Sequence, residues 1–228
     1  KRVGILFPLF KMIFTKADGI QAISKYLADW GRDMGHRAEI DIVPNGVDIK
    51  RFDIEISKLE RLKIRQEIGL GEGDIALVTT SRLVVKNGVG DVVAALSHLP
   101  LNIKFVIFGE GDLKENIKSQ VVNLKLEERV IFGGFLTHDE MRKYLKACDI
   151  FIRPSLSEGF GNSFIEAMAA RLPVIATAVG GIPEFIEDGI TGYFCEPQNP
   201  ESIAKIVRRV IDDVGTNRVV DNAHKMVK

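Results

Sequence analysis

The chain has 228 residues, of which 46% are hydrophobic and 27% are charged, a balance that is typical of globular proteins and excludes a disordered chain. Its 31 Lys and Arg residues match its 31 Asp and Glu residues, so a nucleic acid or an anionic membrane surface is not expected as the main partner. Cys148 and Cys195 lack metal-ligand spacing, which favours buried thiols in a reducing compartment. No apolar run reaches the length of about 18 residues that would indicate a membrane-spanning helix.

Residues 1–47 are predicted to be the end of a preceding α/β domain. Strand-like segments at 19–24 and 39–44 enclose a helical pattern at 25–35, and Pro44-Asn45-Gly46 is a turn signal that marks a crossing between domains. The apolar start has no initiator Met and is interrupted by Lys11, which indicates the interior of a longer chain rather than a signal peptide. We therefore expect residues 48–228 to form a second domain.

From residue 75 onward, apolar β-branched segments alternate with amphipathic ones. The former lack polar alternation, which is typical of parallel strands that are buried on both faces, at 75–80, 103–108, 129–134, 149–154 and 173–178. Between them, helical spacing of apolar residues predicts helices at 89–99, 112–126, 137–148 and 163–172, and two more helices are expected at 201–214 and 217–228. Thr137 and Glu140 form a capping-box signature. The pattern predicts an α/β fold with a doubly wound, Rossmann-like parallel sheet.

Ligands of such sheets bind outside the carboxyl ends of the strands, so the loops after the strands are the candidate site. The loop after 75–80 carries Arg82 and Lys86, whose cations would neutralise a phosphate-bearing ligand or else form an exposed basic loop. Gly109 and Gly111 follow the next strand and allow close approach of a backbone. We expect the loops of Arg82, Gly109 and Glu158 to meet at one edge of the sheet.

The loop Gly159-Phe160-Gly161-Asn162 is the richest candidate. It leads into a helix, whose free N–H groups bind anions or hydroxyl oxygens. Glu158 precedes it and Glu166 follows it, and carboxylates suit vicinal sugar hydroxyls because they accept two hydrogen bonds at once. Two other interpretations stay open here: Ser163-x-x-Glu166 is itself a capping box, and Glu158 is a solvated loop acid.

No metal site is expected. The four histidines are scattered and no Asp-x-Asp occurs, so the sequence lacks the usual signal for a divalent ion that bridges a diphosphate. Arg82 and Lys86 would have to supply the positive charge instead.

Five segments together resemble the carboxyl-terminal domain of family 4 retaining glycosyltransferases, which have the two-domain GT-B fold: VPNGVD (43–48), SRLVVKNG (81–88), FGEGD (108–112), SEGFGNSFIEAMA (157–169) and VGGIPEFIEDGITGYF (179–194). The resemblance covers residues 40–214 and implies transfer of a sugar from a nucleotide donor to an acceptor with the anomeric configuration kept. It makes residues 1–47 a remnant of the acceptor-binding domain and residues 48–228 the donor-binding domain.

The resemblance also implies roles for single residues. Glu158 would lie by the donor sugar, Glu166 would bind the ribose, and Arg82 would hold the diphosphate. Lys86 stands one position before the family's usual lysine, where this chain has Asn87. The implied catalytic residues are Glu158, Arg82 and Lys86, and the implied donor-binding residues are Gly109, Leu136, Gly159, Phe160, Gly161, Asn162 and Glu166.

The expected partner is a UDP-, GDP- or ADP-linked sugar. No cofactor and no nucleic acid are expected, and the sequence does not identify the acceptor. Alone, the fragment should bind donor and transfer little sugar, its Glu158 face should be open to solvent, and residues 1–35 should pack less completely than the core. The resemblance favours a cytoplasmic protein and allows membrane contact through the other domain.

Three other classes of protein share some of these features. No G-x-G-x-x-G follows a strand, as a dinucleotide oxidoreductase requires. A glycoside hydrolase needs two carboxylates that flank one bond at about 5–9.5 Å, whereas here one would face the ribose. A non-catalytic nucleotide-binding module stays open as the alternative.

Overall fold

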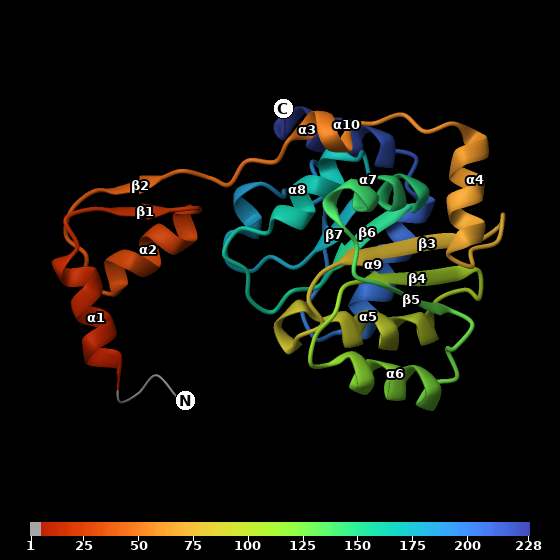
Figure 1. Ribbon diagram of the computed structural model, residues 1–228, viewed down its shortest axis with the longest axis horizontal. Coiled ribbons are helices and arrows are strands. Elements are labelled where there is room, and N and C mark those ends of the chain that lie inside the picture. Colours follow the sequence, from red (N-terminus) through yellow and green to blue (C-terminus); the bar gives the residue numbers. More distant parts are fainter. Residues whose placement is uncertain (1–5) are drawn as a thin grey trace.

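The computed structural model describes residues 6–228 (Figure 1). Its first part comprises α1 (Phe7–Lys16), β1 (Ile20–Ala22), α2 (Lys25–Asp33) and β2 (Ile40–Ile42), with β1 and β2 paired in parallel. The expected strands and helix are therefore present, although residues 1–5 of the expected remnant lie outside the described residues. None of the residues of α1 is buried, which confirms the looser packing expected of residues 1–35 as far as this helix is concerned.

Residues 43–48, which include Pro44-Asn45-Gly46, form no regular secondary structure and link β2 to α3 (Ile49–Phe52). After α3 comes α4 (Lys58–Glu67), which the sequence analysis did not anticipate. Ser57 caps α4 by accepting a hydrogen bond from the Glu60 amide. Assignment of residues 1–47 to an acceptor-binding domain stays a prediction.

The rest of the chain forms one six-stranded parallel sheet in the order β5-β4-β3-β6-β7-β8. The strands are β3 (Ile75–Thr80), β4 (Ile103–Phe108), β5 (Val130–Gly134), β6 (Ile150–Arg153), β7 (Val174–Ala176) and β8 (Tyr193–Phe194). The five expected strands are confirmed, and β8 is an addition. The chain adds strands outward from β3 in one direction, then returns to β6 and continues in the other, which is the order of a doubly wound Rossmann-like sheet.

Helices cover both faces of this sheet, and Figure 1 shows α5 and α6 on one side of it with α7 and α8 on the other. One core contains Leu77, Phe105 and Ile152 from the strands, and the other contains Val78, Phe108 and Phe151. These cores lie under α5 (Val89–Ala95), α6 (Lys114–Asn123) and α9 (Pro200–Asp212), and under α7 (His138–Ala147), α8 (Asn162–Ala169) and α10 (Thr216–Met226). Thr137 and Glu140 form the expected capping box of α7. No helix within residues 6–228 has the length and apolar character to cross a membrane.

Backbone hydrogen bonds join the loops at the carboxyl edge of the sheet. Ser81 N donates to Phe108 O at 3.0 Å, Leu156 N donates to Lys86 O at 2.7 Å, and Gly181 N donates to Glu158 O at 3.1 Å. The loops that follow β3, β4, β6 and β7 are thereby linked to one another. The expected convergence of the Arg82, Gly109 and Glu158 loops is confirmed.

At Gly109 the backbones of two of these loops come into direct contact. Its φ is +140°, and a Cβ at this position would overlap the carbonyl oxygen of Ser81. Gly109→Ala should therefore lower the free energy of unfolding by about 2–3 kcal/mol, measured by urea denaturation. Gly73→Ala is the matched control, because a Cβ there meets nothing within 4 Å, and it should stay within about 0.5 kcal/mol of the wild type. Equal stability of both variants would contradict the close approach.

Candidate functional site

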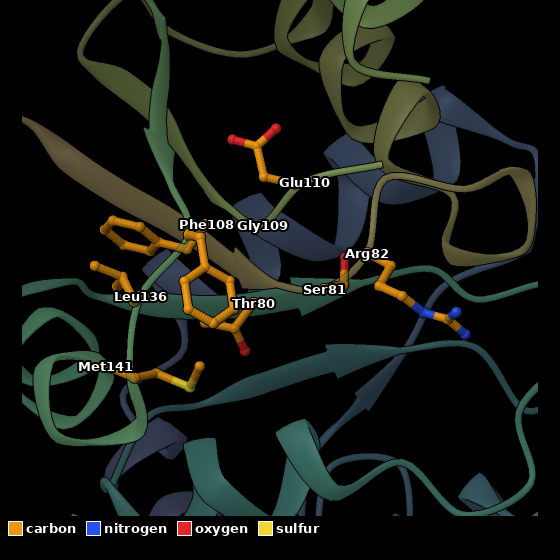
Figure 2. A pocket seen from close by; sticks show the side chains of 9 residues that line it. Thr80, Ser81, Arg82, Phe108, Gly109, Glu110, Leu136 and Met141 are labelled. Carbon is orange, nitrogen blue, oxygen red and sulfur yellow. The ribbon is translucent and has the colours of Figure 1, made fainter. Parts of the chain in front are cut away.

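A cavity of about 320 Å³ opens where β3, β4 and β5 end (Figure 2). Phe108, Leu136 and Met141 point toward one another at one end of it, whereas the Arg82 side chain extends from the opposite end. Gly109 lines the cavity as well, and so does Phe135, whose side chain is 77% exposed. The cavity thus combines an apolar surface suited to a flat ring with a cation suited to a phosphate.

Two hydroxyl groups of this cavity have no protein partner. Thr80 Oγ1 and Ser81 Oγ are both shielded from solvent and make no hydrogen bond within the described residues, although both residues line the cavity. A buried polar group without a partner costs free energy, and a bound ligand would relieve that cost. The sequence analysis missed both residues, because a threonine that ends a buried strand gives no signal of its unmet hydrogen bond.

The basic loop after β3 is shaped by Asn87. Its side chain is 4% exposed and its Nδ2 donates to Arg82 O at 2.7 Å, so this residue organises the backbone of the loop. Arg82 and Lys86 are exposed, and neither of them forms an ion pair with another described residue. Arg82 lines the cavity and Lys86 does not.

The glycine loop leads directly into α8, whose N-cap is Gly161 with φ +99°. The Phe160 ring packs in the core, with its centre 5.3 Å from the centre of the Phe185 ring. Phe160 would therefore contact a ligand mainly through its backbone. No backbone N–H from Phe160 to Ser163 donates a hydrogen bond to another described residue. Asn162 Oδ1 accepts from Asn45 Nδ2 at 3.1 Å. The start of α8 therefore offers free donors to an anion or a hydroxyl group.

Glu158 forms an ion pair with a buried arginine. Arg153 Nη2 lies 2.7 Å from Glu158 Oε2, and Glu158 Oε1 accepts from Gly159 N at 3.1 Å. The Glu158 side chain is 15% exposed, so its interpretation as a solvated loop acid is wrong. The ion pair draws the carboxylate inward.

Arg153 itself was missed by the sequence analysis, although a charge at the end of the apolar strand IFIR was a signal. Its Nη1 donates to Ser163 Oγ at 2.8 Å, and its guanidinium lies 4.3 Å from the centre of the Phe164 ring. Burial lowers the pKa of Arg153, and the charge of Glu158 opposes that shift. The arginine thus fixes Glu158 and the first turn of α8 together.

Glu166 is not a capping residue. Gly161 is the N-cap of α8, and Ser163 Oγ accepts from Arg153 instead of capping the helix, so the capping-box interpretation is wrong. The Glu166 side chain is 12% exposed, and among the described residues the nearest basic side chain is His138, with Nδ1 3.9 Å from Oε1. Burial raises the pKa of the Glu166 carboxyl, while His138 and Arg153 oppose the shift. A half-desolvated carboxylate without a close partner is a candidate ligand-binding group.

The residues expected to bind ligand thus lie on neighbouring loops. Arg82, Gly109 and Leu136 line the cavity, whereas Glu166 does not line it and lies 3.9 Å from His138 at the start of α7. Glu158 and the glycine loop follow β6, which is next to β3 in the sheet. The site therefore occupies the point where the strand order reverses.

The chain matches the family model of the glycosyl transferases group 1 over residues 60–226 and belongs to that family. An uncharacterized glycosyltransferase of Methanocaldococcus jannaschii is 33% identical over 192 residues, which are 83% of this chain and 49% of that protein. The 2-deoxystreptamine glucosyltransferase of Streptomyces kanamyceticus is 32% identical over 178 residues, 76% of this chain and 46% of that protein. The chain spans about half the length of these curated relatives.

Solved structures share the architecture. Anabaena HepE, in complex with UDP and glucose, matches 97% of this chain and 61% of its own with a TM-score of 0.89 and 26% identity. The carboxyl-terminal domain of a group 1 glycosyl transferase from Francisella tularensis matches 80% of this chain and 96% of its own, with a TM-score of 0.67 and 25% identity. The fold is that of GT-B glycosyltransferases.

The unpartnered carboxylate of Glu166 should cost stability. Its folded-state pKa is raised, so the folded protein holds the proton more tightly than the unfolded chain, and stability is lost as pH rises through the folded-state pKa. Glu166→Gln should therefore raise Tm at pH 7 by about 2–4 °C, which corresponds to about 1 kcal/mol at this chain length. The gain should vanish below the unfolded pKa of about 4.3. Calorimetry across this pH range tests it, with exposed Glu187→Gln as control; a gain that persists at low pH would contradict it.

The pair of Arg153 and Glu158 should be coupled in stability. Arg153→Met should lower the free energy of unfolding by about 3–5 kcal/mol, because the Glu158 carboxylate loses its partner. Adding Glu158→Gln to that variant should recover about 1–3 kcal/mol. Urea unfolding of the single and double variants measures the coupling. Losses that simply add would show that the two side chains act independently.

Proposed function

We propose that this chain is the nucleotide-sugar-binding part of a retaining glycosyltransferase of family 4. The proposal depends most on one observation: backbone hydrogen bonds join the loops after β3 and β6 at the reversal of strand order, so that the apolar cavity with Arg82 and the free N–H groups before α8 belong to the same edge of the sheet. Its likeness to HepE, which binds UDP and glucose, supports the same use of the site. Because the chain spans only part of its relatives, the activity of the whole protein belongs to this proposal.

A nucleotide sugar would occupy the site from the cavity toward α8. The base would enter the cavity beside Phe108 and Leu136. Glu166 would accept hydrogen bonds from the ribose. The sugar would then lie at the loop that begins with Glu158.

The diphosphate would lie between Arg82 and the start of α8. Arg82 supplies a cation, with Lys86 further along the same loop, and the backbone from Phe160 to Asn162 supplies free donors. As the bond between the anomeric carbon and the phosphate oxygen breaks, negative charge grows on the departing diphosphate. Fixed cations and N–H dipoles stabilise that charge more than they stabilise the bound donor, which accelerates the reaction.

Retention of configuration would follow from attack of the acceptor oxygen on the same face from which the diphosphate departs. This route needs no second carboxylate as nucleophile, in keeping with a Glu158 that is held by Arg153. No metal ion is part of the proposal, because Arg82 and Lys86 take the charge-neutralising role. The acceptor would bind largely on the amino-terminal side, and the chain alone would transfer little sugar.

Calorimetric titration with UDP, GDP and ADP tests the proposal, and HepE makes UDP the first probe. Glu166→Gln should weaken UDP binding by about 1–3 kcal/mol, because a charged acceptor of the ribose hydroxyls is lost. Glu158→Gln should leave the affinity for free UDP within about twofold, because that carboxylate would face the sugar and no nucleotide atom. EDTA should leave the affinity unchanged.

The exposed residue Glu187 provides the control, since Glu187→Gln removes the same charge and should not alter UDP affinity. Equal loss of UDP affinity in the Glu158 and Glu166 variants would overturn the two assigned roles. Binding of UDP but of no UDP-linked sugar would favour the alternative, a non-catalytic nucleotide-binding module. No binding of any nucleotide would overturn both.

A further inference from the structure

Glu184 connects the two parts of the chain in a way that the proposed function does not use. It ends the short 3-10 turn Ile182–Glu184 after β7, and its side chain is exposed. Both carboxylate oxygens accept hydrogen bonds from the start of α2: Lys25 N donates to Oε2 and Tyr26 N to Oε1, each at 2.8 Å. A carboxylate of the domain with the six-stranded sheet thus caps a helix of the amino-terminal part.

The contact is electrostatically favourable. The first N–H groups of a helix have no partner within the helix, and the positive end of the helix dipole attracts an anion. Leu27 N donates to Ser24 Oγ at 3.2 Å, so Ser24 caps one group and Glu184 caps the two that precede it. Charged bidentate contacts are the stronger and more directional kind of hydrogen bond. Glu184 therefore fixes both the position and the direction of α2.

The same end of α2 rests on the two glycine loops. A Cβ on Gly181 would lie 3.0 Å from Ser24 Cβ, and a Cβ on Gly159 would lie 3.1 Å from Leu27 Cδ1. Gly181 is in turn bonded to the backbone of Glu158. Figure 1 shows that the end of α2 that follows β1 faces the six-stranded sheet domain. Ser24 and Leu27 thereby pack against one side of the loop that would hold the donor sugar.

We infer that Glu184 is a positioning residue that clamps α2 onto the loops 158–162 and 179–184, and so closes the sugar side of the donor site. The inference rests on the proposed function for the identity of the sugar, while the clamp itself is independent of it. Glu184 has no role in binding the nucleotide, because both of its oxygens are occupied by α2.

Amide hydrogen exchange of the unliganded chain tests the clamp. In Glu184→Ala, the amides of Lys25 and Tyr26 should exchange about tenfold faster than in the wild type, because their acceptors are gone. Glu184→Gln keeps one carbonyl acceptor and should give an intermediate rate. Glu187→Ala, a loss of charge in the same loop, should leave both amides protected. Unchanged protection in Glu184→Ala would overturn the clamp.

A variant on the helix side makes the test independent of residue 184. Lys25 occupies the first position of α2, which tolerates proline, and Ser24 before it has the extended backbone that proline requires. Lys25→Pro removes one clamp donor without breaking the helix, and Lys25→Ala is the control that keeps it. Lys25→Pro should speed exchange at Tyr26, and combining it with Glu184→Ala should add little. Fully additive effects would overturn the inference.

Titration with UDP and UDP-glucose then tests the positioning role. Glu184→Ala should bind UDP like the wild type but should lose about threefold or more of the affinity ratio of UDP-glucose over UDP, because the packing of Ser24 and Leu27 against the sugar loop is released. Glu184→Gln should restore part of that ratio. An unchanged ratio with faster exchange would mean a clamp without a role in donor binding and would overturn the positioning role. If the wild type binds no nucleotide, the proposed function fails, while the exchange result still decides the clamp.

Discussion

The reversal of strand order between β3 and β6 is the constraint on which the rest of this structure depends. β3 pairs in parallel with β4 along its whole length and with β6 at Leu77 and Val78. Because the connections from β3 and from β6 leave to opposite faces of the sheet, the loops after these strands separate and open a crevice. The proposed ligand groups lie at the carboxyl ends of these strands, on the loops after them or in the helices that follow. A different strand order would place Arg82 and Glu158 apart, even with the same local sequence.

The crevice is formed at a cost to stability. Thr80 and Ser81 hold buried hydroxyl groups without partners, and Glu166 holds a carboxyl whose pKa is raised by burial. Each of these groups is less favourable in this surrounding than in water. The dense core on both faces of the sheet compensates for them, since its large side chains are fully buried. Groups that are unfavourable for folding and gather around one cavity are a physical sign of a binding site.

The sheet could be predicted from the sequence because strands buried on both faces lack polar residues, as in IALVTT and IKFVIF. β8 was missed because two residues are too short for any periodicity, and α4 because its sequence is mostly polar. The local pattern could not decide whether Glu166 binds a ligand or caps the helix, since Ser163-x-x-Glu166 fits a capping box. The structure excludes the capping role, because α8 begins after Gly161. The roles of Thr80, Arg153 and Glu184 depend on partners far away in the sequence or on their absence, which no local pattern contains.

The internal partners of the acidic residues determine the charge that a ligand would meet. Glu158 and Glu184 both lie at the glycine loops, and two carboxylates there would repel a diphosphate. Arg153 neutralises Glu158 from beneath, and the N–H groups of α2 neutralise Glu184 from the side. In the cavity itself, the Glu110 carboxylate is paired with Lys114 at 2.8 Å. The exposed cation of Arg82 and the free N–H groups at the start of α8 would then attract an anionic ligand, and Glu166 would attract hydroxyl donors. The contact of Glu184 with α2 that joins the two parts of the chain would thus also reduce the repulsion that a bound diphosphate would meet.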